Sequence, residues 1–185
     1  MRFSPTAIPG VILIEPKVFS DDRGCFFESY QRDVFLKNGI RVEFVQDNHV
    51  VSSAGTLRGL HFQKPPMTQA KLLRAMRGSV YDVAVDVRRG SPTYGKHVGV
   101  TLSAENRKML YVPEGFAHGY LALEESDVLY KVTNPWAPNL DSGLIWNDPD
   151  LKIDWPVPQT AVRLSEKDRQ LPRLKDLGPI FQFSS

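Results

Sequence analysis

Runs of alternating apolar and polar residues, rich in β-branched and aromatic side chains, follow one another along most of this sequence. An alternation with a period of two is typical of strands that bury one face. Turn residues separate the runs, as in Asp21-Asp22-Arg23-Gly24, Arg77-Gly78 and Pro113-Glu114-Gly115. Many short strands joined by turns predict an all-β fold, either a sandwich or a barrel. We expect strands over residues 11–15, 25–30, 42–50, 71–76, 79–87, 97–102, 108–112, 116–121 and 127–133.

Helix is predicted in two short places only. Residues 31–37 have a helical apolar spacing that stops at Asn38-Gly39, and Ser165 has the position of an N-cap for a turn that includes Asp168. Residues 134–158 are rich in Pro, Asn, Asp and Trp, and we expect them to form an ordered loop packed over another part of the protein. The length of 185 residues favours one domain over 1–185, with 134–185 as loops and short helices on the barrel.

Composition excludes several classes of protein. The 23 basic and 21 acidic side chains give a net charge of +2, which is too balanced for a nucleic-acid-binding face. The single cysteine, Cys25, excludes an internal disulfide framework, and we interpret it as a small apolar strand residue rather than a nucleophile. The sequence shows neither a signal peptide nor an apolar stretch long enough to span a membrane. We therefore expect a soluble cytoplasmic protein.

Two histidine segments stand out within the strand pattern. His61 lies in Leu57-Arg58-Gly59-Leu60-His61-Phe62-Gln63, and His118 lies in the segment over residues 111–119. Small β-barrels that hold a metal usually present His-x-His here, but the second position after His61 is Gln63. Two imidazoles and an amide are a poor ligand set for zinc or iron. We therefore predict no metal, and an enzyme that removes a proton next to a carbonyl group.

His61 is the candidate general base, because an unperturbed imidazole titrates close to neutral pH. The alternative is a buried histidine whose ring is satisfied by a backbone carbonyl. As a base, His61 needs an acceptor that fixes its tautomer, and Asp168 is one candidate.

Lys71, Leu73 and Ala75 share one face of their predicted strand. If that face points inward, Lys71 is a buried charge that could stabilise an enolate oxygen; if it points outward, Lys71 is an ordinary surface lysine. Tyr130 could donate a phenolic proton, although a core tyrosine is the commoner role. Arg23 and Arg58 are candidates for binding phosphate.

Taken together, these segments resemble the dTDP-4-dehydrorhamnose 3,5-epimerase family, whose members are cupin-fold enzymes of deoxysugar biosynthesis. The resemblance covers nearly the whole chain. It extends over 22–24, 27–28, 44–48, 57–63, 78–86, 111–120, 130–133, 146–149, 153–156 and 165–168. It implies a cupin-type jelly roll and the metal-free epimerisation of dTDP-4-dehydro-6-deoxy-D-glucose at C3 and C5, which gives dTDP-4-dehydro-L-rhamnose without a cofactor.

By this resemblance His61 is the proton acceptor, Asp168 its orienting partner and Tyr130 the proton donor. Lys71 is implied to lie beside the C4 carbonyl oxygen. The family forms homodimers that exchange N-terminal strands, so Arg23 and Glu28 are expected to serve the partner's site. The implied substrate contacts are Arg23, Glu28, Gln46, Asp47, Asn48, Arg58, His118 and Lys167.

The chain departs from the family pattern after residue 133. A pair of aromatic residues is usual there, whereas this sequence reads Asn134-Pro135-Trp136, and a glutamate of the next loop is shortened to Asp141. Trp136 and Asp141 are expected to contact the sugar, and they leave open whether both centres are inverted. The alternatives are an epimerase of one centre or a ketoisomerase acting on the same nucleotide sugar. A metal-dependent cupin is disfavoured by Gln63, and a binding module without activity would not need His61, Tyr130 and Lys71 together.

Overall fold

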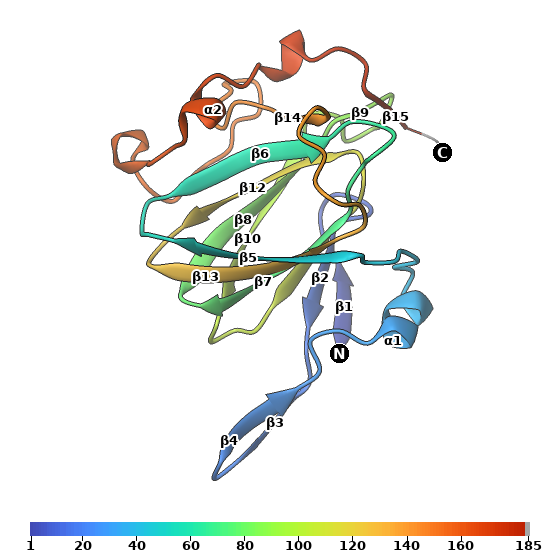
Figure 1. The fold of residues 1–185 in the computed structure, drawn as a ribbon, viewed down its shortest axis with the longest axis vertical. Coiled ribbons are helices and arrows are strands. Elements are labelled where there is room, and N and C mark those ends of the chain that lie inside the picture. Colours follow the sequence, from blue (N-terminus) through green and yellow to red (C-terminus); the bar gives the residue numbers. More distant parts are fainter. Residues whose placement is uncertain (184–185) are drawn as a thin grey trace.

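The computed structural model describes residues 1–183 as two antiparallel sheets that face each other (Figure 1). The sheets are not closed into a barrel, and the arrangement is the cupin type expected from the resemblance. The six-stranded sheet has the order β1 (Arg2–Pro5), β2 (Ile12–Glu15), β11 (Met109–Val112), β7 (Lys71–Arg77), β13 (Ser126–Val132) and β5 (Gln46–Ser52). The five-stranded sheet has the order β10 (His97–Ser103), β8 (Ser79–Asp86), β12 (Phe116–Ala122), β6 (Leu57–Gln63) and β14 (Asp141–Gly143).

Smaller elements surround the two sheets. The strands β3 (Val18–Asp21) and β4 (Gly24–Phe27) form a hairpin, and β9 (Arg88–Arg89) pairs in parallel with β15 (Phe181–Gln182). The helices are α1 (Arg32–Lys37) and α2 (Glu166–Arg169), with short 3₁₀ turns at Gln159–Ala161 and Leu174–Asp176. Ser165 caps α2 by accepting the Asp168 backbone N–H, as the sequence predicts.

Alternation along the strands builds the interior between the sheets. On β8, Val80 and Ala84 point inward, where they pack with Leu73 of β7 and Val128 of β13. Val83 and Val85 of β8 point to the opposite face of the same sheet, and both faces are therefore apolar. This explains why β8 reads as an almost continuous hydrophobic segment rather than a strictly alternating one.

The C-terminal part of the chain covers the outer face of the five-stranded sheet (Figure 1). Trp146 and Trp155 are buried there, and the Trp155 indole N–H donates to the Trp146 carbonyl at 3.0 Å. The prediction of an ordered, packed segment is therefore confirmed for these two tryptophans. It is wrong for Trp136, which is 62% exposed.

Two strand predictions are too long. The strand predicted over 25–30 ends at Phe27, and the one predicted over 42–50 begins only at Gln46. Tyr30 and Phe44 instead pack edge to face with each other beside α1. Aromatic residues that pack on a helix give the same apolar pattern in sequence as a strand. The pattern records that the side chains are buried and does not record whether the backbone pairs with another strand. The strands β1, β3, β6, β9, β14 and β15 lie outside the predicted strand ranges.

The hairpin of β3 and β4 projects away from the two sheets (Figure 1). Its side chains Phe19 and Phe26 are 53% and 66% exposed, and Cys25 is exposed as well. Arg23 at its tip contacts Asp21 of the same hairpin at 2.6 Å. This hairpin therefore carries an apolar surface that the rest of the described chain does not cover.

Candidate active site

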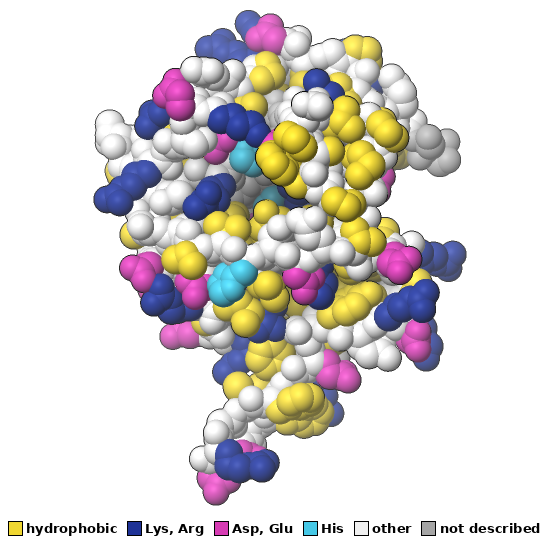
Figure 2. Space-filling view, in the orientation of Figure 1, with side chains coloured by type: hydrophobic (Ala, Val, Ile, Leu, Met, Phe, Trp, Pro, Cys, Tyr) yellow, Lys and Arg dark blue, Asp and Glu magenta, His cyan; other side chains and the backbone are white. Residues whose placement is uncertain are grey.

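A cleft opens between the two sheets, and most of the predicted site residues line it. It consists of two adjoining cavities of about 300 and 390 Å³, which share His61, Lys71 and Tyr130. This volume is in the range of sites for small organic ligands. Figure 2 shows the hollow, with histidine visible inside it and basic side chains on part of its rim.

An irregularity in β6 places two side chains in the cleft. His61 lies opposite His118 on β12, but Arg58 lies opposite Tyr120, so three steps on β6 match two on β12. Residues three apart on a regular strand point to opposite faces, whereas the extra residue of a β-bulge turns both to one face. Arg58 and His61 therefore both line the same cavity.

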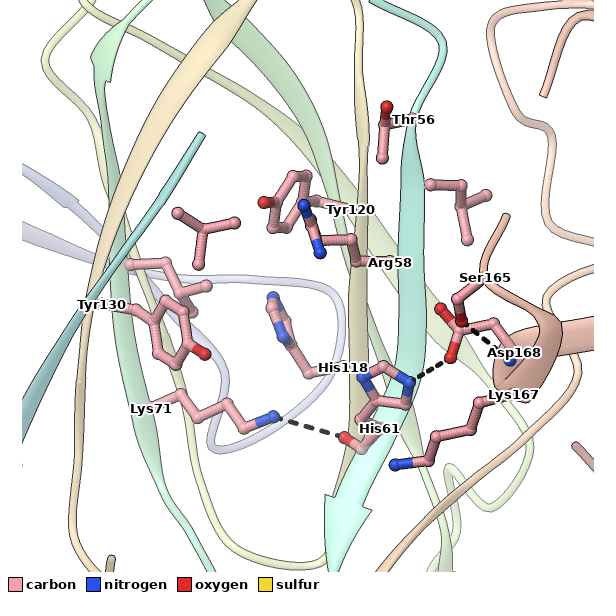
Figure 3. A pocket seen from close by; sticks show the side chains of 13 residues that line it. Thr56, Arg58, His61, Lys71, His118, Tyr120, Tyr130, Ser165, Lys167 and Asp168 are labelled. Atoms are coloured by element: carbon pink, nitrogen blue, oxygen red, sulfur yellow. Dashed lines mark hydrogen bonds and ion pairs between the residues drawn. The ribbon is translucent and has the colours of Figure 1, made fainter. Parts of the chain in front are cut away.

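Asp168 holds the ring of His61. The distance from His61 Nε2 to Asp168 Oδ1 is 2.6 Å (Figure 3). The Gly59 N–H donates to the other carboxylate oxygen at 3.3 Å. Burial raises the pKa of Asp168, but the hydrogen bond and charge of His61 and the Gly59 N–H outweigh it, so the pKa lies below its ordinary value. Because the carboxylate accepts from Nε2–H, Nδ1 of His61 keeps its lone pair and is available as a base.

Lys71 points into the cleft, so the alternative of an outward surface lysine is wrong. Its side chain is buried, and Nζ lies 3.4 Å from the carbonyl oxygen of His61. Burial lowers the pKa of Lys71 to about 8, against the opposing charges of Asp141 and Asp82. At neutral pH an ammonium group thus faces the cleft, where a developing negative charge would be stabilised.

Tyr130 lies on the opposite wall from His61 (Figure 3). It belongs to β13, where it stands across from Asn48 of β5 and Leu73 of β7. Burial, together with the neighbouring Tyr120 and Asp141, raises the pKa of Tyr130 above its ordinary value, and Arg58 only partly opposes this. The phenol therefore keeps its proton at neutral pH.

A second histidine and aspartate pair lies deeper in the same region. The ring Nε2 of His118 is 3.0 and 3.1 Å from the two carboxylate oxygens of Asp82, and both side chains are buried. His118 was predicted from the sequence as a site residue, whereas Asp82 was not. Asp82 could have been recognised as an acidic residue within the hydrophobic strand β8, because a buried carboxylate is costly unless it is paired.

Gln63 has a structural role that its place in the sequence does not predict. Its amide nitrogen donates to the carbonyls of Met67 and Pro135, at 2.6 and 3.1 Å, and its oxygen accepts the Ala137 N–H at 2.6 Å. These contacts anchor the loop that carries Trp136 over the cleft. Within residues 1–183, no group of three or more His, Cys, Asp or Glu side chains is arranged to hold a metal ion.

The remaining predicted contacts divide into two groups. Asp141 accepts from the Trp136 indole N–H at 3.2 Å and pairs with Lys167, so this contact joins β14 to α2 at the edge of the cleft. The first group lines the cleft and consists of Gln46, Asn48, Arg58, His118, Trp136, Asp141 and Lys167. The second group lies outside it. Asp47 points outward from β5 to Lys131, Glu28 is exposed beside the hairpin, and Arg23 lies at its tip.

Comparison with known proteins gives one consistent result. Residues 5–176 match the model of the family described as dTDP-4-dehydrorhamnose 3,5-epimerase. A relative of that name from Pseudomonas aeruginosa is 56% identical over 172 residues, which is 92% of this chain and 94% of the relative.

Solved structures agree with this result. A dTDP-6-deoxy-D-glucose-3,5-epimerase from Legionella pneumophila, in complex with dTDP-4-keto-L-rhamnose, has a TM-score of 0.95 and 41% identity over 100% of this chain and 99% of that one. A 3'-monoepimerase from Streptomyces bikiniensis, in complex with dTDP-quinovose, has a TM-score of 0.89 and 34% identity over 96% and 92%.

The facing sheets and the histidine–aspartate cleft between them define a cupin-type protein with an acid–base site. The cleft residues belong to segments that lie within the matched region 5–176. The chain belongs to the dTDP-4-dehydrorhamnose 3,5-epimerase family. No helix within residues 1–183 is long and apolar enough to cross a membrane.

Proposed function

We propose that this chain epimerises dTDP-4-dehydro-6-deoxy-D-glucose at C3 and C5 to dTDP-4-dehydro-L-rhamnose, as a step of dTDP-L-rhamnose biosynthesis. One observation carries the proposal: a base, His61 with Asp168, and a phenol, Tyr130, lie on facing sheets of one cleft. Inversion of a carbon centre needs a proton removed from one face and another delivered to the opposite face. A site with both groups on one wall could not do this without turning the substrate over.

The chemistry follows from the 4-keto group of the substrate. It acidifies the hydrogens on both neighbouring carbons, C3 and C5, so that His61 Nδ1 can remove either proton and leave an enolate. The Lys71 ammonium group stabilises the enolate oxygen, because its charge acts in a buried site where water screens it poorly. Tyr130 then delivers a proton from the other side.

The cleft residues around these groups fit a nucleotide sugar. Arg58 and Lys167 supply positive charge for the diphosphate, and Gln46, Asn48 and His118 supply hydrogen-bonding groups for the sugar. The relative from Legionella pneumophila was solved with dTDP-4-keto-L-rhamnose, a ligand of this chemical class.

The proposal includes a homodimer in which the β3–β4 hairpin reaches the partner's cleft. Arg23 and Glu28 are predicted substrate contacts, yet neither lines the cleft of its own chain. The exposed Phe19 and Phe26 of the same hairpin form an apolar surface suited to a partner. Both facts are explained if the hairpin packs against a second copy of the chain.

Inversion of one centre alone is the second candidate function. The 3'-monoepimerase from Streptomyces bikiniensis has the same fold, and Trp136 and Asp141 depart from the family pattern beside the cleft. These residues bear on how the sugar is oriented rather than on the acid–base groups. The two candidates therefore share the base and the enolate stabiliser, and differ only in the number of carbons inverted.

The test is NMR of the substrate incubated with the enzyme in deuterated water. We expect deuterium at C3 and C5 and inversion at both carbons, whereas inversion at one would establish the second candidate. His61→Ala should lose exchange at both carbons, by about 10²–10⁴ in rate, because one base serves both. His49→Ala is the matched control, since His49 is exposed on the outer face of β5. Exchange near the native rate in His61→Ala would contradict the proposed role.

The exchanged hairpin is tested by mixing two inactive variants, Arg23→Ala and His61→Ala. In a mixed dimer, one cleft has both defects and the other has neither. Random mixing in equal amounts makes half of the dimers mixed, and we expect about a quarter of the native activity to return. If Arg23 served its own cleft, no active site would form and the mixture would stay inactive.

A further inference from the structure

The guanidinium group of Arg58 connects the two sheets at the cleft. Arg58 belongs to β6 of the five-stranded sheet, and its Nε donates at 3.0 Å to the hydroxyl oxygen of Ser52, at the end of β5 in the six-stranded sheet. Its Nη2 donates to the carbonyl oxygen of Val51 at 3.3 Å. Arg58 is an exposed residue whose donors water could satisfy, so its contact with a buried hydroxyl group calls for a role.

The hydroxyl group of Ser52 has a second partner, which is Tyr120 of β12. The two hydroxyl oxygens lie 3.0 Å apart, and the residues are 2% and 3% exposed. Burial raises the pKa of Tyr120 above its ordinary value, although Ser52 and Arg58 act in the opposite direction, so the phenol keeps its proton at neutral pH. A serine hydroxyl by itself rotates, whereas one that bonds both Arg58 and Tyr120 has a fixed direction.

We propose that Ser52 is a positioning residue, which together with Tyr120 holds the guanidinium group of Arg58 in place for the diphosphate of the substrate. The proposal rests on the proposed function, in which Arg58 binds that diphosphate. Ser52 lies outside the two cavities that form the cleft, and it acts through Arg58 rather than by touching a ligand.

The contacts with β5 leave one edge of the guanidinium group for a ligand. Such a group offers an anion two edges, one formed by Nε with Nη2 and one formed by Nη1 with Nη2. Within residues 1–183, the hydrogen bonds of the Arg58 side chain go to Ser52 and Val51, which occupy the first edge. Arg58 and Tyr120 both line the cleft (Figure 3), so the second edge is available there to two phosphate oxygens. A long side chain that is already held loses less conformational freedom when the ligand binds.

The variant Ser52→Ala tests the role of the hydroxyl group. We expect the dissociation constant of dTDP, measured by calorimetry, to rise about 3–10-fold, because Arg58 must then be ordered by the ligand itself. KM for the substrate should rise by a similar factor, and kcat should change much less, because His61, Lys71 and Tyr130 are untouched. Native affinity for dTDP in this variant, or a loss confined to kcat, would overturn the inference.

A double-mutant cycle tests whether the effect passes through Arg58. Arg58→Ala should weaken the binding of dTDP, and the addition of Ser52→Ala should then weaken it no further, because the side chain that Ser52 positions is absent. An equal loss from Ser52→Ala with and without Arg58 would overturn the inference. Native affinity for dTDP in Arg58→Ala would overturn it as well, together with the proposed contact between Arg58 and the diphosphate.

Ser126→Ala is the matched control. Ser126 of β13 stands directly opposite Ser52 of β5 and is also buried, but its hydroxyl group donates to the carbonyl oxygens of Ser79 and Glu124 at 3.0 and 2.8 Å. This variant should lose thermal stability and keep the native affinity for dTDP. If it weakened binding as much as Ser52→Ala, the effect would come from packing of the sheet and the inference would fail.

A measurement on the native protein remains valid even if Ser52→Ala does not fold. Nitrogen-15 relaxation of the arginine Nε–H groups, without ligand, should show Arg58 as rigid and the exposed Arg41 as mobile. Equal mobility of the two side chains would overturn the inference. Failure of the proposed function would look different: the native protein would then show a rigid Arg58 and bind dTDP, yet exchange no deuterium into the substrate.

Discussion

At the scale of single residues, the proposed mechanism assigns the two halves of an inversion to side chains on different sheets. His61 is turned toward the cleft by Asp168, while Tyr130 projects from β13 of the facing sheet and keeps its proton because its pKa is raised. In that mechanism neither group can replace the other, since each would meet a different face of a flat enolate. Separate variants should therefore separate proton removal from proton delivery.

Tyr130→Phe keeps the ring and its packing but removes the acidic hydroxyl. His61 and Lys71 are untouched, so proton removal should continue. The enolate should then be protonated again on the face from which the proton was removed. We expect deuterium to enter at C5 with retained configuration, together with loss of net epimerisation. NMR in deuterated water measures both.

The control for this variant is Trp136→Tyr, because Trp136 lies beside the cleft but carries no acidic proton. We expect exchange to stay intact while the ratio of C3 to C5 inversion changes. Normal epimerisation of C5 by Tyr130→Phe, or loss of exchange at both carbons in Trp136→Tyr, would show that this division of roles is wrong.

At the scale of elements, the bulge in β6 decides which side chains reach the cleft. Gly59 lies at the bulge with a φ of +121°, a backbone conformation that residues other than glycine rarely adopt. A Cβ atom at this position would lie 2.6 Å from the Cα of Gly119 and 2.8 Å from the carbonyl oxygen of His118. The two strands approach closely here because both residues lack a side chain.

Gly59→Ala should therefore push β6 away from β12 and displace Arg58 and His61 together. We expect the free energy of unfolding to fall by about 2–3 kcal/mol, measured by urea denaturation, and kcat to fall further than the loss of folded protein explains. Gly178→Ala is the control, because a Cβ atom there meets nothing within 4 Å. A Gly59→Ala variant with native kcat would show that the bulge is not what positions His61.

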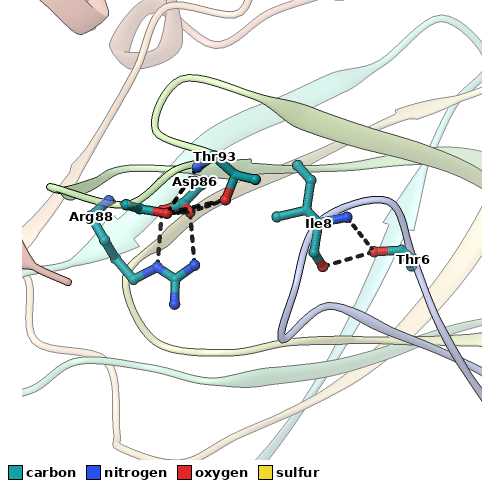
Figure 4. A network of polar contacts seen from close by, with 6 residues as sticks. Thr6, Ile8, Asp86, Arg88 and Thr93 are labelled. Atoms are coloured by element: carbon teal, nitrogen blue, oxygen red, sulfur yellow. Dashed lines mark hydrogen bonds and ion pairs between the residues drawn. The ribbon is translucent and has the colours of Figure 1, made fainter. Parts of the chain in front are cut away.

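At the scale of the whole molecule, a polar network around the buried Asp86 includes Arg88 of β9 (Figure 4), and β9 pairs with β15 of the C-terminal segment. Asp86 accepts hydrogen bonds from Arg88, Ser91 and Thr93 at 2.6 to 2.9 Å. The guanidinium group of Arg88 lies 4.5 and 5.0 Å from the ring centres of Phe116 and Phe183. The network thus joins β8 and β12 to the strand pair of β9 and β15.

This network predicts how stability depends on pH. Burial raises the pKa of Asp86, but the hydrogen bonds from Arg88, Ser91 and Thr93 outweigh it and hold the pKa below its ordinary value of 3.8. A group whose pKa is lower in the folded state stabilises the fold above its ordinary pKa, and this contribution is lost as the pH falls through the folded pKa.

We expect Asp86→Asn to lower the free energy of unfolding by about 2–3 kcal/mol at pH 7. The difference from the native protein should shrink as the pH falls below 3.8, because the unfolded chain then takes up a proton on Asp86 before the native carboxylate does. Urea denaturation at pH 7 and at a pH below 3.8 measures this difference in the free energy of unfolding. A difference that is equal at both would show that the charge of Asp86 does not matter.

The sequence by itself determined the class of fold, and it identified the candidates for the main acid–base groups that the structure then places in one cleft. Period-two patterns predict the strands because burial of one face is a local property, and the motifs around His61 and Lys71 predict an acid–base site rather than a metal site. The N-cap at Ser165 could also be predicted from the sequence, since it depends on neighbouring residues alone.

Only the tertiary structure decided how these groups meet. The sequence left open whether Lys71 points inward, and it gave Asp82 no role, because both depend on which strands face each other. The bulge that turns Arg58 and His61 to one side arises from the pairing of β6 with β12, fifty or more residues apart. Distances between strands that are remote in sequence are set by packing between the sheets, and no local pattern records them.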